Sequence, residues 1–162
     1  MITPKELAAA FGRNASICAS QCKGLDHADS LLQPEHRGNC LNWVLGHIVG
    51  SRDTILQALG AEAIVGEEKK ARYGYGSNPV LADGDDLLRL EELLSLLASS
   101  QETLAEKLSA LRERGLGEAV DSFMGEGTTL GQLLFFLYFH ETYHTGQTEY
   151  LRQLTDVNDK VI

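Results

Sequence analysis

Apolar side chains recur at helical spacing in four stretches of the chain, and no stretch alternates convincingly as a β-strand does. The first begins near Thr3, where Thr3 and Glu6 have the pattern of a capping box and Pro4 suits the first helical turn. The other three cover residues 40–59, 85–114 and 129–155. This pattern predicts an all-α fold, a four-helix bundle.

Two connections between these stretches are long. Residues 26–39 hold His27 and His36 among polar neighbours, and we expect both to be ordinary surface side chains. Residues 60–84 show no clear period. A crossover of this length would let the second and third helices run parallel instead of forming a hairpin.

The last predicted helix carries the most informative feature of the sequence. One row of positions, three or four apart, lies on a single helix face that we expect to be buried: Leu130, Leu133, Leu137, His140, His144, Gln147, Leu151 and Leu154. Side chains four apart on a helix lie about 5–6 Å apart, which suits two imidazoles that share a metal ion. Burying each polar ring without a partner would cost roughly 1–3 kcal/mol. The row therefore favours metal binding over two ordinary core histidines.

His47, in the second predicted helix, is the candidate third ligand. Trp43 precedes it by one turn and either walls the same pocket or belongs to the core. Gly46 and Gly50 each cost roughly 1 kcal/mol relative to alanine inside a helix, so we expect them to admit a neighbouring helix or a ligand beside His47. Three imidazoles suit Zn²⁺, Ni²⁺ or another late divalent ion and leave positions open for water or substrate.

Two other readings of HETYH, residues 140–144, fit the sequence less well. The H-E-x-x-H pattern of zinc proteases would make Glu141 a general base, but no histidine follows His144 and no sheet is predicted. A ferritin-like di-iron site needs a second E-x-x-H motif, and Val44 stands where that motif would place glutamate before His47. A mononuclear site remains.

Glu141 and Gln147 are the candidate residues around the ligands. Glu141 lies about 100° around the helix from His140, so it either orients an imidazole or another nearby group, or faces solvent. Gln147 lies one turn past His144 on the inner face, and we expect it to contact a substrate or bound water.

Length, charge and composition exclude several classes of function. With 162 residues and 43% hydrophobic content, the chain is expected to form one domain, residues 1–162. The net charge of −9 argues against nucleic acid as a partner. No membrane span or signal peptide is visible, which predicts a cytoplasmic protein without a membrane partner.

Cys18, Cys22 and Cys40 form no CxxC pair, so neither a zinc ribbon nor a disulfide scaffold is indicated.

Two motifs resemble the DinB-like (DinB/YfiT) family: NWVLGHIVGSRD around His47 and FHETYHTGQTEYLRQL around His140 and His144. The whole chain fits the order of elements in that family. The resemblance implies a four-helix metalloprotein with up-down-down-up topology, a long second connection, frequent homodimers, and His47, His140 and His144 as ligands.

The resemblance implies less about the reaction. Characterised relatives include transferases that use low-molecular-weight thiols such as bacillithiol or mycothiol, and a thiol-dependent isomerase; others are described as hydrolases. We expect an enzyme, dependent on zinc or nickel, that activates a thiol or water to act on a small molecule. Thiol S-transfer is the leading reaction and hydrolysis the second. The alternatives are a non-catalytic metal-binding stress-response bundle and a member with an empty site and an apolar pocket.

Overall fold

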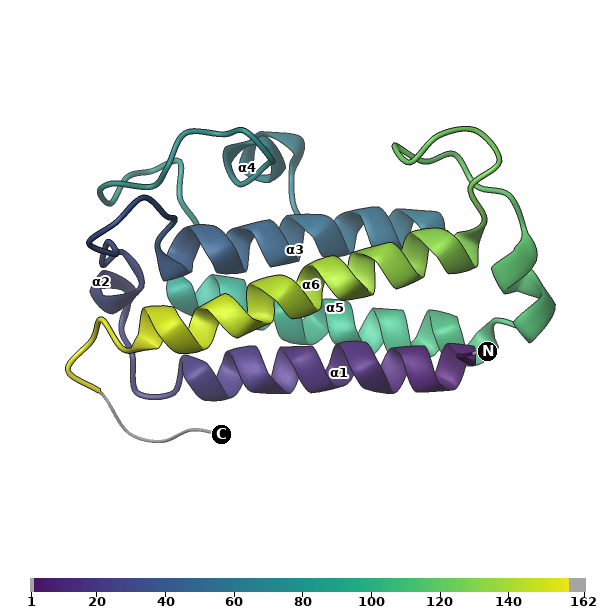
Figure 1. Ribbon diagram of the computed structural model, residues 1–162, viewed down its shortest axis with the longest axis horizontal. Helices are drawn as coiled ribbons and strands as arrows, with labels where there is room; N and C mark the ends of the chain where they lie inside the picture. The colour runs from purple at the N-terminus through teal and green to yellow at the C-terminus, as the bar shows by residue number, and fades with distance from the viewer. Residues whose placement is uncertain (1, 158–162) are drawn as a thin grey trace.

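The computed structural model describes residues 2–157, and the predicted all-α fold is confirmed. Four long helices form a bundle: α1 (Pro4–Gln21), α3 (Leu41–Ala58), α5 (Leu90–Ala110) and α6 (Leu130–Arg152) (Figure 1). Short elements lie in the connections: α2 (His27–Ser30), α4 (Glu67–Arg72) and the 3₁₀ helix η1 (Glu113–Gly117). Thr3 and Glu6 form the predicted capping box at the start of α1.

The four long helices have the up-down-down-up topology. Asn42, at the start of α3, donates a hydrogen bond to the Leu88 carbonyl just before α5 (2.9 Å), and Arg52, ten residues later, donates to the Leu97 carbonyl (3.3 Å). The two helices therefore advance in the same direction. Figure 1 shows α1 and α6 running the opposite way, on the near side of the bundle.

The crossover that makes α3 and α5 parallel is folded against the bundle. Its Tyr73 is 1% exposed. The Tyr73 hydroxyl donates to Asn42 Oδ1 (2.9 Å) and accepts from the Leu88 N–H (2.8 Å). A Cβ atom on Gly46 would overlap the Tyr73 ring. The glycine thus admits a side chain of the crossover, which corrects the expectation that it serves a neighbouring helix or a ligand.

The third long helix is shorter than the predicted 85–114, because it begins at Leu90 and ends at Ala110. Leu87 and Leu88 are buried just before the helix. The Leu88 N–H donates a hydrogen bond to the Tyr73 hydroxyl, and the Leu88 carbonyl accepts one from Asn42. These tertiary bonds hold residues 85–89 outside the helix.

The prediction for His27 is wrong, because this side chain is 3% exposed. Its Nε2–H donates to Asp83 Oδ1 (3.1 Å), and its Nδ1 accepts from the Leu90 N–H (3.2 Å). Because Leu90 is the first residue of α5, its N–H has no partner within the helix. His36 is exposed, as predicted.

Leucine-rich faces of the long helices form the core. Cys18, Cys22 and Cys40 lie in it as free thiols. Burial raises the pKa of Cys18 to about 11 and that of Cys22 to about 12, so both thiols stay protonated at neutral pH. Within residues 2–157, no helix combines the length and apolar character that a membrane span requires.

Candidate metal centre

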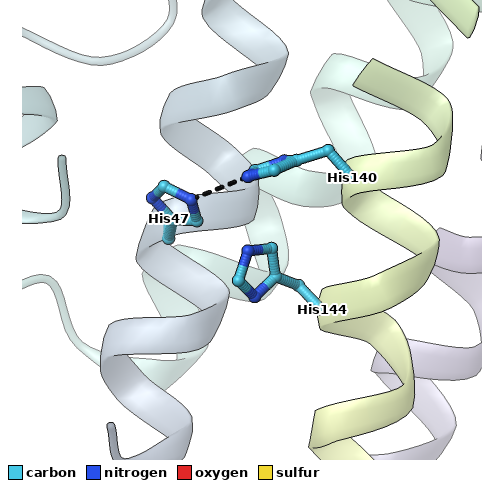
Figure 2. A group of neighbouring side chains, drawn as sticks. All are labelled: His47, His140 and His144. Atoms are coloured by element: carbon cyan, nitrogen blue, oxygen red, sulfur yellow. Dashed lines mark hydrogen bonds between the residues drawn. The ribbon is translucent and has the colours of Figure 1, made fainter. Parts of the chain in front are cut away.

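The structure brings the three predicted ligands together on the facing sides of two helices. His47 projects from α3, and His140 and His144 project from α6 toward it (Figure 2). One ring nitrogen of each residue lies within 4.8 Å of the other two, and His47 Nε2 lies 3.0 Å from His140 Nε2. Three histidines placed this close can bind one metal ion.

Hydrogen bonds on the far side of two rings fix which nitrogen faces the centre. His47 Nδ1 lies 2.7 Å from the Tyr73 carbonyl, and His144 Nδ1 lies 2.7 Å from Gln147 Oε1. Both oxygens can only accept, so each Nδ1 carries the hydrogen and each Nε2 keeps a lone pair. This is the outer hydrogen bond that metal-binding histidines usually make.

The contact between His47 and His140 fits a shared cation. Because His47 Nε2 already presents a lone pair, its 3.0 Å approach to His140 Nε2 is favourable only with a proton or a cation between them. A proton there would serve this one contact, whereas a cation would serve all three rings. His140 Nδ1 is buried without a hydrogen-bond partner in the described part of the chain. An ion bound at Nε2 would leave this Nδ1 unchanged, so the contact between the two Nε2 atoms is what favours a cation.

All three imidazoles are neutral at pH 7. Burial lowers the pKa of His47 and of His144. Burial, together with the neighbouring His144 and His47, lowers the pKa of His140 to about 4. Neutral imidazole is the form that binds metal ions, so protons compete weakly for this centre.

The three histidines line a cavity of about 1010 Å³ that opens to solvent. Trp43 is both core and wall, because it is 7% exposed and also lines the cavity. Its indole stacks on the His47 ring at 4.7 Å between centroids, and its Nε1–H donates to Ser77 Oγ (3.0 Å). The cavity leaves room for water or a small molecule beside the histidines.

The predicted inner row of the last helix is not buried along its whole length. His140, His144 and Gln147 are half-buried and line the cavity, whereas the buried positions of this half of α6 are Glu141, Thr145, Thr148, Leu151 and Arg152. The row advances by 3.5 residues per turn on average, and an α-helix has 3.6, so the row drifts around the helix by ~20° per heptad. The drift carries the histidines from the core to the edge of a cavity.

Glu141 faces neither solvent nor the imidazoles. It is 1% exposed, does not line the cavity, and accepts two hydrogen bonds of 2.9 Å from Arg52. The solvent-facing interpretation is therefore wrong. The position also gives no support to a protease-like general base, because the carboxylate has no access to the cavity. Gln147, the other candidate, lines the cavity and orients His144.

Sequence reasoning missed three contributors to this site. The Tyr73 carbonyl, which binds His47, belongs to a stretch without periodicity and gave no signal. Arg52 was also missed, although a lone arginine inside an apolar helix indicates a buried partner. A row of exposed aromatic residues on α6 lines the cavity and could have been read from its helical spacing: Phe136, Phe139, Tyr143 and Tyr150.

Comparison with known proteins agrees with this architecture. The family model described as DinB family matches residues 1–158. A solved structure, described as a conserved protein from Enterococcus faecalis, superimposes with a TM-score of 0.72 at 15% sequence identity, covering 95% of this chain and 97% of that chain. This likeness shows the fold. No curated protein sequence matches the chain.

Proposed function

Since the chain belongs to the DinB family, we propose that His47, His140 and His144 hold one divalent metal ion, zinc or nickel, in an enzyme that activates a thiol or water. The observation that supports this most is the pair of outer hydrogen bonds that His47 and His144 donate to the Tyr73 carbonyl and to Gln147 Oε1, which turn two Nε2 lone pairs toward the centre. A divalent ion bound there lowers the pKa of a thiol or water that it binds, which supplies a nucleophile at neutral pH.

The cavity lining favours a nucleophile that comes from outside the chain. None of the three cysteines lines the cavity, and all of them are buried elsewhere. Ser77 does line it, but its hydroxyl oxygen accepts the Trp43 N–H. A low-molecular-weight thiol would therefore have to enter as a substrate. Thiol S-transfer is the reaction we propose first, with hydrolysis by water as the second.

The chain's own residues would hold the reactants in place. Tyr73 and Gln147 fix the imidazole orientations, and Trp43 packs against one ring face of His47. The cavity matches the volume of pockets that enclose drug-sized ligands, ~300–1,000 Å³. The α6 aromatic row would exclude water from one side of a bound molecule.

The first test is the metal content of untagged protein purified without chelator, measured by mass spectrometry. We expect about one equivalent per chain in the parent protein, and its loss in both His47→Ala and His144→Ala. His36→Ala is the matched control, because His36 lines the same cavity outside the cluster. A parent protein that takes up neither zinc nor nickel overturns the proposal.

A second measurement separates an enzyme from a structural metal protein. Removing the metal should leave the helical circular dichroism intact if the site is catalytic, and should unfold a bundle that depends on the ion. Turnover of a panel of thiols with electrophiles, lost on chelation and restored by metal, would identify the reaction. The homodimer implied by family resemblance stays a proposal, which light scattering would test.

A further inference from the structure

The cavity beside the histidines is free of carboxylates in an otherwise acidic protein. The chain has 23 acidic residues, yet no aspartate or glutamate is among the described residues that line the cavity. Arg37 is the one lysine or arginine in that lining. Glu141 follows a predicted ligand directly, but Arg52 binds its carboxylate on the side away from the cavity. The local charge is thus opposite in sign to the charge of the whole chain.

Charge balance then restricts what the site accepts. Three neutral imidazoles would leave both charges of a divalent ion uncompensated, because no carboxylate of the described chain lines the cavity and Glu141 is already paired with Arg52. In a partly buried site such a charge acts strongly on groups within a few ångströms. An entering anion is attracted, and an entering cation is repelled.

The aromatic wall of the cavity indicates the chemical character of the uncharged part of the ligand. The large side chains of the α6 aromatic row are exposed: Phe136 38%, Phe139 63%, Tyr143 61% and Tyr150 59%. Exposed apolar side chains gathered beside a cavity are typical of a binding surface. Flat rings bury a planar apolar group well, and their faces also attract cations. The rings alone would not decide the sign of the ligand, whereas the metal and Arg37 do.

We infer that the cavity takes a small organic anion, with its charged group toward the three histidines and a planar apolar body along the α6 aromatic row. This inference rests on the proposed function. Arg37, in the segment between α2 and α3, adds a positive charge at the wall of the same cavity.

Calorimetric titration of zinc-loaded protein with four matched probes tests the inference. The probes are 2-naphthoate, the cation 2-naphthylmethylamine, the neutral 2-naphthylmethanol, and acetate as an anion without a ring. We expect naphthoate to bind at least about tenfold more tightly than each of the other three, a difference well within the resolution of the method.

Variants of the protein test which residue contacts the charged group of the ligand and which contacts its ring. Arg37→Gln should weaken naphthoate severalfold and leave naphthylmethanol unchanged. Phe139→Ala should weaken the binding of naphthoate and of naphthylmethanol and leave that of acetate unchanged. Arg13→Gln is the matched control, because Arg13 is exposed on α1 and does not line the cavity.

Failure of this inference can be distinguished from failure of the proposed function. If the protein holds one equivalent of zinc but binds the amine as tightly as naphthoate, the inference is overturned and the metal site stands. Equal naphthoate affinity with and without zinc also overturns it, because the charge argument requires the ion. Failure to take up either zinc or nickel is detected before any probe is added, and it overturns both the proposed function and this inference.

Discussion

The Arg52 guanidinium and the Glu141 carboxylate form a bidentate ion pair that joins α3 to α6 inside the bundle. Both hydrogen bonds are 2.9 Å long, and the two side chains are 0% and 1% exposed. Glu141 directly follows His140, and Arg52 lies five residues after His47. Arg52 also donates to the Phe11 carbonyl on α1 and to Ser100 Oγ on α5. One guanidinium thus contacts all four long helices next to the candidate metal centre.

Removing either member of this pair should destabilise the protein strongly. Arg52→Met leaves the Glu141 carboxylate buried without a partner, which typically costs 3–5 kcal/mol in the free energy of unfolding. The double variant Arg52→Met, Glu141→Leu removes both charges and should recover most of that loss. Denaturant unfolding of the metal-free proteins measures both effects.

The same double variant shows whether the ion pair also positions the ligands. We expect it to bind zinc at least about tenfold more weakly than the parent, because apolar packing does not fix the relative position of α3 and α6 as directed hydrogen bonds do. Zinc affinity equal to that of the parent, in a variant of restored stability, would show that the pair serves folding alone.

Gln147 is expected to control metal affinity through His144. Gln147→Leu removes the acceptor for His144 Nδ1–H, and loss of such an outer hydrogen bond typically costs 10–100-fold in affinity. Gln147→Glu keeps an acceptor oxygen and should retain most of the affinity. Competition for zinc with a chromophoric chelator measures this; comparable losses in the two variants would contradict the proposed role.

Gly46→Ala should be far more damaging than Gly50→Ala, although both add a methyl group to α3. A Cβ atom at position 46 overlaps the Tyr73 ring, whereas one at position 50 makes an ordinary contact with Lys70 at 3.7 Å. Overpacking of this kind costs about 1–3 kcal/mol. Displacing Tyr73 also moves the carbonyl that binds His47, so zinc affinity should fall with stability. Similar unfolding midpoints for the two variants would argue against this packing.

The stability of the metal-free protein should fall as the pH is lowered from about 6.5 toward 4. His140 has a pKa of about 4 in the folded protein, below the value of 6.5 for an unperturbed histidine. Between these values the unfolded chain binds more protons, so stability rises with pH. Thermal unfolding with chelator, between pH 7 and pH 5, should give a shallower dependence for His140→Gln and an unchanged one for His36→Gln.

The helices and the three histidines could be predicted because helical periodicity is a local property of the sequence. The first predicted helix begins, and the second begins and ends, close to the predicted positions for this reason. The burial of His27 could not be predicted, since it depends on Asp83 and Leu90, more than fifty residues away. The late start of α5 likewise depends on Tyr73 in the crossover.

The position of the histidines relative to the core was the subtler error. A row with an average step of 3.5 residues predicts one buried face, although the buried face of a straight helix advances by 3.6 residues per turn. This small difference accumulates along α6. In its second half Glu141 and Thr145 are buried, whereas His140 and His144 are half-buried. A site that must admit a ligand requires this outward drift.

The stacking of Trp43 on His47 gives the protein an optical reporter of its candidate metal centre. The chain has a single tryptophan, so all indole emission originates 4.7 Å from the ring of one candidate ligand. Occupancy of His47 by a paramagnetic ion such as Ni²⁺ would quench this emission directly, without any label. Loading of the site could therefore be followed by fluorescence in real time, and under the same conditions as turnover.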